Sequence, residues 1–359
     1  LKQASTGPEG LAVWRVLTSV NQGFAEKFAR ESGADLGAEA LKSGRQAAQE
    51  LGGRGRGLMA ALTPSGAAPA SNGAQRSPAD WAKLVQERGN AARGERIYHS
   101  ATMTCVQCHA IGGAGGKLGP DMSTLGASAP LDYVIESVLN PAAKVKEGYH
   151  GVSYSMTDGG AVVGVPFEEN AQSVRVRMPG GVEMDLAKAK IKSSEVIGSL
   201  MPAGLVEGLS EEDKINLFAF LGSVGRPGAF DASNGGVARA WRVVSDVAAA
   251  SKPEALQAAP SIYSLTDGRL LPEHWQMAVG AVQGGTLHAV TRVDAGSGGK
   301  VRIEVQGAPE FFVDGERVQG AVLERALSAG SHVVSVPVKR DALPAVLKVT
   351  ASSARFVAP

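Results

Sequence analysis

Two cysteines and a histidine stand close together in the run Cys105-Val106-Gln107-Cys108-His109. Two thiols three residues apart, followed at once by an imidazole, are the attachment pattern of a c-type haem: each thiol adds to a vinyl group and the histidine ligates the iron. The chain contains only two cysteines, so this spacing next to a histidine is improbable by chance. The sequence therefore predicts one covalently attached haem c, bound through Cys105 and Cys108, with His109 as an axial ligand.

Two other interpretations of this segment stay open. The cysteines could form a free dithiol beside an unrelated histidine, or they could supply two thiolate ligands to a zinc ion. A structural zinc site needs four ligands, and no second pair of cysteine or histidine residues is evident in the sequence. If both thiols carry haem, none is left for a disulfide bond, so the stability of the fold must come from packing.

The second axial ligand of a six-coordinate haem iron must come from elsewhere in the chain. A methionine thioether in this position raises the reduction potential. Among the eight methionines, Met201 is favoured because it lies in the loop Leu200-Met201-Pro202 before a capped helix, and Met122 is the competing candidate. Core packing is the alternative role for either residue. An open sixth position would instead favour a peroxidase-like enzyme or a small-gas binder.

The predicted haem also bears on location. Covalent haem attachment in bacteria takes place outside the cytoplasm, so we expect a periplasmic or otherwise extracytoplasmic protein. The sequence begins at Leu1 and lacks a signal-peptide pattern, so we expect a processed or excised chain.

No apolar run approaches the roughly 20 residues that span a bilayer. The net charge of +1 provides no global field that would attract nucleic acid.

The first 77 residues divide into a helical segment and a linker. In residues 1–62, apolar side chains recur every three or four positions over 11–28 and again over 38–51, which predicts two helices. These helices could form a hairpin or the end of a helical repeat array. Residues 63–77 are rich in Pro, Ser, Gly and Ala, the composition of a flexible linker.

Residues 78–225 are predicted to be a mainly helical domain that contains the haem motif. Ser77 and Pro78 are the expected N-cap and first residue of a helix, and Asn140-Pro141 is expected to end another. Between the helices, residues 150–192 switch to a period of two, which predicts a small inserted antiparallel β-sheet. Ser210 and the acidic residues after it are expected to cap the last helix.

Residues 230–359 are predicted to form a β-sandwich, because short alternating runs recur at about ten-residue spacing between glycine-rich turns. The expected fold is therefore multi-domain α+β: a helical segment, a mainly α domain with an inserted sheet, and a β-sandwich. The runs with this pattern are 287–293, 301–305, 311–313, 332–338 and 346–350.

Further motifs extend the pattern around Cys105 to His109 in a fixed order. They are Gly112 to Gly116, Leu118 to Met122, Leu139-Asn140-Pro141 with Gly148-Tyr149 after it, Asp158-Gly159, and Ser199 to Leu205. Together they make the segment from about 80 to 223 resemble the haem-binding domain of planctomycetes and verrucomicrobia. That family is a class I type cytochrome c with a β insertion between the third helix and the methionine loop.

The resemblance implies Met201 as the distal ligand. It also implies that Pro120 lies beside the proximal imidazole, where its backbone carbonyl could accept a hydrogen bond from Nδ1 of His109. Such a bond would fix the orientation of the imidazole and increase its basicity. An ordinary turn residue is the alternative for Pro120. Met122 stands where the family commonly has leucine, so this second methionine stays a competitor.

The resemblance further implies electron transfer by a single haem between an extracytoplasmic dehydrogenase and an acceptor. In this family the haem domain often ends a long protein, after a sugar-dehydrogenase-like propeller and helical repeats. The dehydrogenase could therefore oxidise sugars and could lie on the same full-length chain. The expected partner is a redox protein or a redox domain.

The C-terminal domain resembles carbohydrate-associated jelly-roll modules in two short passages, Phe311 to Glu316 and Leu327 to Val333. Such a module would favour polysaccharide binding, with the haem as an accessory. Core or edge packing is nevertheless the expected role of the aromatic residues, with glycan contact as the alternative, and His288 and His332 are expected to be packing or surface residues. The candidate glycan contacts are Trp241, Trp275, Tyr263 and His274.

No hydrolase triad, phosphate-binding loop or nucleic-acid motif is visible in the sequence. Two pairs of adjacent acids, Glu168-Glu169 and Glu211-Glu212, could suggest acid–base chemistry. Their positions instead predict a turn and the start of a helix, where negative charge is favourable.

Overall fold

The computed structural model describes residues 38–50, 62, 76–100, 103 and 105–359. The chain divides into two compact units, Leu1–Arg76 and Ser77–Pro359. In the first unit the described helix is α3, Ala38–Glu50, which matches the predicted second helix. The predicted helix at 11–28 and nearly all of the predicted linker lie outside the described residues.

Helices form the first part of the second unit, where the predicted end signals are present. The side chain of Ser77 accepts a hydrogen bond from the backbone N–H of Asp80, and that of Ser210 accepts one from Asp213. Asn140 ends a helix directly before a proline. These helices are α5 (Pro78–Arg88), α6 (Ala91–His99), α9 (Leu131–Leu139) and α10 (Glu211–Leu221).

Helices α6 and α10 cross at a point where no side chain separates their backbones. A Cβ atom added at Gly94 of α6 would lie 1.8 Å from the carbonyl oxygen of Asn216 in α10, so only glycine permits this approach. One turn later, the rings of Tyr98 and Phe220 pack with their centroids 5.5 Å apart. Residues Ile215 to Leu221 of α10 are all buried, which makes this helix the centre of the helical part.

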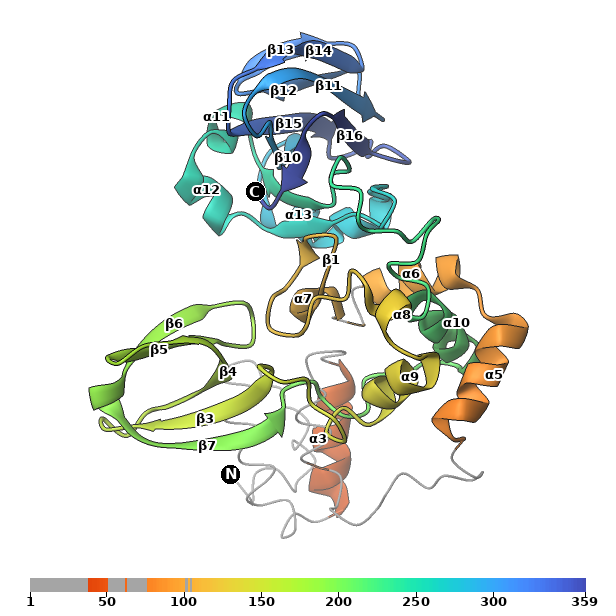
Figure 1. Cartoon of the computed structure of the whole chain (residues 1–359), viewed down its shortest axis with the longest axis vertical. Coiled ribbons are helices and arrows are strands. Elements are labelled where there is room, and N and C mark those ends of the chain that lie inside the picture. The colour runs from red at the N-terminus through yellow and green to blue at the C-terminus, as the bar shows by residue number, and fades with distance from the viewer. Residues whose placement is uncertain (1–37, 51–61, 63–75, 101–102, 104) are drawn as a thin grey trace. The chain divides into compact units, whose positions relative to one another are not determined.

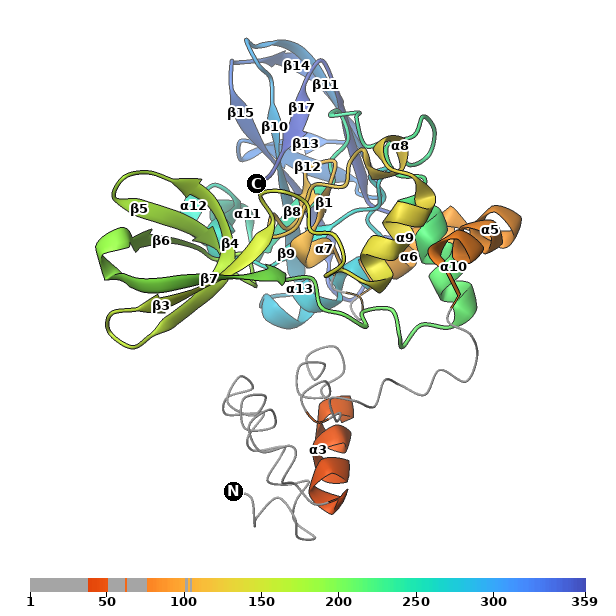
Figure 2. The same cartoon turned by 60° about the horizontal axis from the view of Figure 1, so that its bottom comes forward.

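The predicted haem motif forms its own short elements next to these helices. Cys105 to Cys108 make one helical turn, and the chain then forms a small hairpin. In both views this segment lies between the helices and the inserted sheet (Figures 1 and 2). The elements are α7 (Cys105–Cys108), β1 (Ala110–Ile111), β2 (Ala114–Gly115) and α8 (Leu125–Ser128).

Residues 150–199, described throughout, form a five-stranded antiparallel sheet with the order β6-β5-β4-β3-β7. The predicted insertion, 150–192, is too short, because β7 continues to Ser199. This strand lies at the edge of the sheet and most of its side chains are exposed, so it lacks the apolar alternation of a half-buried strand. The strands are β3 (His150–Met156), β4 (Ala161–Glu169), β5 (Ser173–Arg177), β6 (Glu183–Ala187) and β7 (Ile191–Ser199).

Residues 230–359 are described without gaps and contain one seven-stranded and one three-stranded antiparallel sheet. The five predicted β runs coincide with β10, β11, β12, β15 and β16. The larger sheet holds β8 (Ala240–Val244), β9 (Ser261–Tyr263), β10 (Thr286–Asp294), β12 (Glu310–Val313), β13 (Glu316–Gln319), β15 (Ser331–Lys339) and β17 (Arg355–Val357), and the smaller one β11 (Gly299–Gln306), β14 (Val322–Leu327) and β16 (Lys348–Ser352).

Both sheets contribute to one hydrophobic core. Val301 and Val349 of the smaller sheet belong to the same buried cluster as Trp241 and Phe311 of the larger sheet. Short helices pack beside these sheets, and the segment that contains Trp275 adds its indole to the core. They are α11 (Val247–Ala250), α12 (Pro253–Ala258), η5 (Pro272–Trp275) and α13 (Gln276–Ala281).

The described chain is thus a mixed α+β protein with several antiparallel sheets, and its larger β-rich region is C-terminal. The predicted domains 78–225 and 230–359 both belong to the compact unit Ser77–Pro359. In the described parts of the chain, no helix combines the length and the apolar character that crossing a membrane would require.

Candidate functional site

The predicted haem-binding residues border one cavity of about 300 Å³. Helices α6, α9 and α10 contribute to its wall from one side, and β4 and the loop after β7 contribute from another. Most of the lining side chains are apolar, as expected of a site for a large organic cofactor. The cavity brings together Cys105, Cys108, His109, Pro120 and Met201.

His109 is held by three hydrogen bonds. Its ring Nδ1 lies 2.8 Å from the carbonyl oxygen of Pro120, as the family resemblance implies. Its backbone N–H donates to the carbonyl of Cys105 at 2.9 Å, and its own carbonyl accepts from the Tyr98 hydroxyl at 3.1 Å. Since Nδ1–H donates to Pro120, Nε2 is the ring nitrogen that is available as a metal ligand.

The surroundings of His109 favour the neutral imidazole. Burial lowers the pKa of His109, and the hydrogen bond to Pro120 and the charge of Asp121 oppose this effect only in part. The neutral ring is the form that ligates a metal. The hydrogen bond that its carbonyl accepts from His109 also gives Pro120 a specific role, beyond that of an ordinary turn residue.

Gly119 forms a cradle for the imidazole. A Cβ atom at this position would lie 2.4 Å from Cε1 of His109 and 2.7 Å from its Nδ1. The backbone N–H of Gly119 donates to the carbonyl of Cys108 at 2.8 Å, which fixes the loop against the ring. Because any larger residue would displace the ring, this contact fits a histidine that must keep one orientation.

The hairpin after His109 folds back onto helix α7. Gly116 donates its backbone N–H to the carbonyl of Val106 at 2.8 Å. A Cβ atom at Gly116 would lie 1.8 Å from the carbonyl oxygen of Gln107, so the close return of the chain depends on glycine. The motif and the two glycine-rich runs after it therefore form one interlocked segment.

The two cysteines are half-buried next to the cavity. Burial raises the pKa of the Cys108 thiol. Over the described residues, no group of three or more His, Cys, Asp and Glu side chains could hold a metal ion. Within the described part of the chain, the zinc interpretation therefore lacks its remaining ligands, while neutral thioethers would suit this apolar surrounding.

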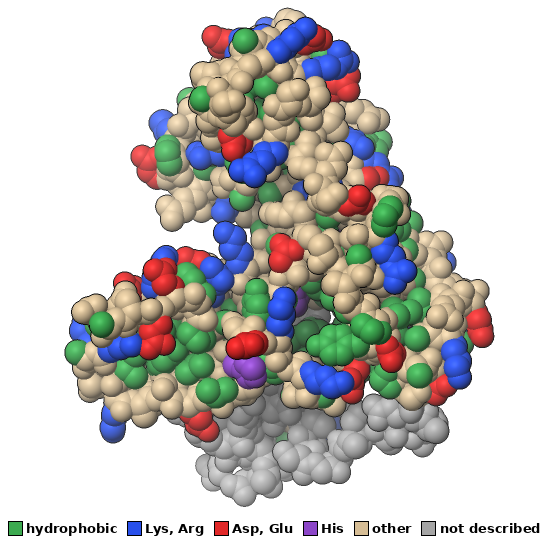
Figure 3. Space-filling model, viewed as in Figure 1, with side chains coloured by type: hydrophobic (Ala, Val, Ile, Leu, Met, Phe, Trp, Pro, Cys, Tyr) green, Lys and Arg blue, Asp and Glu red, His purple; other side chains and the backbone are tan. Residues whose placement is uncertain are grey.

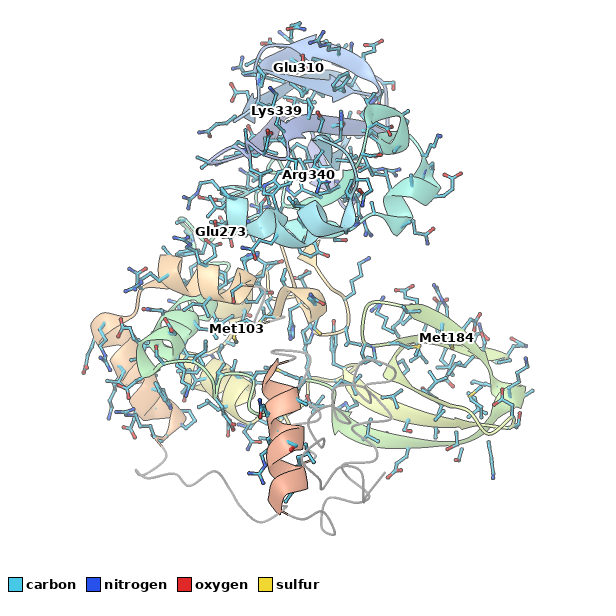
Figure 4. The ribbon with its side chains drawn as sticks, turned by 180° about the vertical axis from the view of Figure 1, so that it is seen from behind. Met103, Met184, Glu273, Glu310, Lys339 and Arg340 are labelled. Atoms are coloured by element: carbon cyan, nitrogen blue, oxygen red, sulfur yellow. The ribbon has the colours of Figure 1, made fainter. Side chains whose placement is uncertain are left out.

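Among the described residues, three methionines border the cavity: Met201, Met122 and Met103. Met201 follows strand β7, and its backbone N–H donates to the hydroxyl of Ser199 at 3.1 Å. Met103 lies in the helical part of the molecule (Figure 4) and is only 3% exposed. The sequence-based prediction overlooked Met103, although its position two residues before Cys105 was a signal that could have identified it.

The exposed side of the cavity carries polar and cationic groups. Lys144 pairs with Glu136 at 2.8 Å, and its Nζ lies 5.5 Å from the centroid of the Tyr133 ring. Lys146 lies 5.8 Å from the centroid of the Tyr149 ring. Hydroxyl and ammonium groups at the edge of an apolar cavity suit a ligand that has an apolar body and polar substituents.

Core packing, the role expected for the aromatic residues of the C-terminal region, is confirmed for both tryptophans, which are therefore not available as glycan contacts. Trp241 and Trp275 are 1% and 0% exposed, because they fill the shared core of the two sheets. His274 is half-buried and its ring packs against His99, with the centroids 5.6 Å apart. Tyr263 is also half-buried, so these aromatics do not form an exposed platform.

His288 and His332 are buried packing residues, as predicted. Nδ1 of His332 lies 2.6 Å from a carboxylate oxygen of Asp314, and Nε2 lies 3.0 Å from the carbonyl oxygen of Ser328 and 3.4 Å from its hydroxyl. Since the closest partner of each ring nitrogen is an oxygen acceptor, both nitrogens act as donors. This arrangement therefore differs from a hydrolase triad, in which Nε2 must accept a proton.

The paired acids also have structural partners. Glu168 binds Arg175 at 2.6 Å, and Glu211 binds Arg88 at 2.6 Å from the first turn of α10. On the face shown in Figure 3, basic and acidic side chains are interspersed. This distribution agrees with the small net charge.

No family model matches the chain, and no match was found among curated proteins.

Proposed function

We propose that the chain is a single-haem c-type cytochrome that transfers electrons. The observation that carries this proposal is the meeting of Cys105, Cys108, His109 and Met201 at one apolar cavity, with Nδ1 of His109 bonded to the carbonyl of Pro120. Met201 is separated from His109 by a whole inserted sheet in the sequence. The convergence of these residues therefore supports a common ligand more strongly than the short motif alone.

The cavity residues have distinct roles in this proposal. When bound, the haem supplies a one-electron Fe(III)/Fe(II) couple. Cys105 and Cys108 would hold it covalently, and His109 would bind the iron through Nε2, with the ring orientation that Pro120 and Gly119 fix. Met201 would supply the thioether ligand, and the mostly apolar wall would keep the surroundings of the iron similar in the two oxidation states.

The resemblance and the fold suggest a wider setting. We assign residues 78–225 to a class I type cytochrome c domain whose β insertion precedes the methionine loop, and residues 230–359 to a β-sandwich. The proposed location is extracytoplasmic, and the proposed partners are a dehydrogenase as electron donor and a redox protein or domain as acceptor. With three methionines at the cavity, we favour a six-coordinate electron carrier over a peroxidase or a gas binder.

Spectroscopy of methionine variants tests this function. The purified chain, coexpressed with a haem-attachment system, should retain haem after denaturation and show the weak far-red band of methionine-ligated ferric haem. Met201→Ala should lose this band, and the matched variants Met103→Ala and Met122→Ala should keep it.

Three outcomes would contradict parts of the proposal. Absence of covalent haem would exclude the cytochrome function. Loss of the band in Met122→Ala or Met103→Ala alone would reassign the ligand. Rapid turnover of peroxide by the unaltered chain would favour the enzyme.

A further inference from the structure

Two charged side chains are buried on either side of Thr266. Arg239 is 4% exposed and Glu95 is 3% exposed, although charged residues are almost never fully buried without partners. Glu95 accepts a hydrogen bond from the backbone N–H of Thr266 at 2.7 Å. Arg239 donates from Nε to the carbonyl of the same residue at 2.6 Å. The two charges are therefore joined through one residue of the C-terminal region.

Arg239 also packs against the segment that follows the proposed haem ligand. A Cβ atom at Gly112 would lie 3.0 Å from Nη1 of Arg239 and 3.1 Å from its Cδ. On its other side, the backbone N–H of Gly112 donates to the hydroxyl of Ser123 at 2.7 Å. Gly112 follows His109 by three residues, so the guanidinium confines the hairpin directly after the imidazole.

Glu95 belongs to helix α6, which also holds the backbone of His109. Tyr98 lies one turn further along this helix, and its hydroxyl donates to the carbonyl of His109. Next to Glu95, Arg96 pairs with Glu273 of the C-terminal region at 2.8 Å (Figure 4). The C-terminal region is thereby fastened to the helix that holds the backbone of His109.

The charges around Arg239 form a compact set. Burial lowers the pKa of Arg239, whereas the carboxylates of Asp231, Asp267 and Glu95 raise it. Burial raises the pKa of Glu95. Removing one buried charge from this set leaves the opposite charges less compensated, and a low dielectric extends their effect over longer distances than in water.

We propose that Arg239 is a positioning residue for the haem: it confines the hairpin after His109 and, linked to Glu95 through Thr266, places buried charge behind this hairpin, so that the C-terminal region helps to set the reduction potential. This inference rests on the proposed cytochrome function. The C-terminal β region would then be part of the redox site rather than a tethered binding module.

The test compares reduction potentials of the full haem-loaded chain by spectroelectrochemical titration. At the ambient potential that half-reduces the unaltered protein, Arg239→Gln should lower the ratio of reduced to oxidised haem by about threefold or more, because the carboxylates left behind favour Fe(III). Arg239→Lys, which keeps the charge, should stay within about twofold of the unaltered protein. Glu95→Gln should shift the ratio in the opposite direction, by about twofold or more.

Arg242→Gln is the matched control. Arg242 lies in β8, three residues after Arg239, and its Nη1 donates to the carbonyl of Ala259 at 2.9 Å. This variant should leave the ratio unchanged within about twofold.

An unchanged ratio in Arg239→Gln, or an equal shift in Arg242→Gln, would overturn the inference. If Arg239→Gln does not fold, the test depends on Glu95→Gln. In that variant, an unchanged or lowered ratio of reduced to oxidised haem would contradict the inference. Failure of the unaltered chain to hold covalent haem would instead reject the proposed function.

Discussion

Because Gly119 has no side chain, its backbone can hold the ring of His109 in one orientation. Its backbone lies against the ring of His109, at a distance that a Cβ atom would reduce to 2.4 Å from Cε1. The same loop supplies the carbonyl of Pro120 that receives the ring N–H. The hydrogen bond to Pro120 and the close contact with Gly119 together orient the imidazole.

We expect Gly119→Ala to displace the ring and to lower the yield of haem-loaded protein. Steric overpacking of this kind typically costs about 1–3 kcal/mol of unfolding free energy, which thermal unfolding would measure. The matched control is Gly208→Ala, because nothing lies within 4 Å of a Cβ atom at Gly208. Equal haem content in both variants would show that Gly119 does not position His109.

Among the secondary-structure elements, two turns of the C-terminal region are fastened together by one buried histidine. Asp314 lies in the turn between β12 and β13, where its φ of 50° is in the left-handed region. Its carboxylate also accepts from the backbone N–H of Val333 at 2.8 Å. Ser328, the other partner of His332, lies after β14, a strand of the smaller sheet. His332 therefore links turns from both sheets.

This link should weaken at high pH. Burial alone would lower the pKa of His332, but the hydrogen bonds to Asp314 and Ser328 and the charge of Asp314 raise it overall. Its contribution to stability is therefore complete below the unfolded pKa of about 6.5 and is lost as pH rises through the higher folded pKa. Asp314→Asn should cost about 1–2 kcal/mol in weak acid and less in alkali.

Asparagine tolerates the left-handed backbone at position 314, so this variant isolates the charge. Denaturant unfolding over a pH series would measure the difference. The exposed residue Asp341 offers the control substitution Asp341→Asn, which should not alter the pH dependence. If both variants showed the same dependence of unfolding free energy on pH as the unaltered protein, the pairing of His332 with Asp314 would contribute nothing to stability.

At the scale of the whole molecule, local signals and long-range contacts differ in how well the sequence predicts them. The helix caps at Ser77 and Ser210 were predictable because each depends on a few neighbouring residues. Strand β7 was predicted only at its start, because an exposed edge strand needs no apolar alternation. The burial of Trp241 and the contact of Arg239 with Gly112 depend on residues far apart in the chain, for which a single sequence carries no local pattern.

The residues of the candidate site also differ in how well the sequence predicts them. Cys105, Cys108 and His109 follow from their types and spacing, and Met201 and Pro120 follow from the family resemblance. Met103 also reaches the cavity, and its position two residues before Cys105 is the only local signal for this role.

The junction between α6 and the C-terminal region should make the second unit sensitive to acid. Burial lowers the pKa of His99 to about 3, with His274 adding to the effect, and burial lowers the pKa of His274 to about 4. The rings face each other beside Arg96 and Glu273, and Nε2 of His99 is a buried atom without a hydrogen-bond partner in the described structure. Protonation would therefore place two positive charges in a poorly solvated space.

Since an unfolded histidine titrates near pH 6.5, the unfolded chain binds more protons than the folded one below that value. Stability should therefore fall as pH decreases from about 6.5 towards 4, by up to about 3 kcal/mol for His274 alone. His274→Asn keeps an acceptor for the N–H of Leu271, which His274 binds at 3.2 Å, and should flatten this dependence.

Thermal unfolding across this pH range would measure the effect, with the exposed residue His150 changed to asparagine as the control. If His274→Asn and His150→Asn lost stability in acid as steeply as the unaltered chain, the junction would not be its acid-sensitive point. A flattened curve in His274→Asn alone would show that the helical part and the C-terminal β region depend on one another for stability.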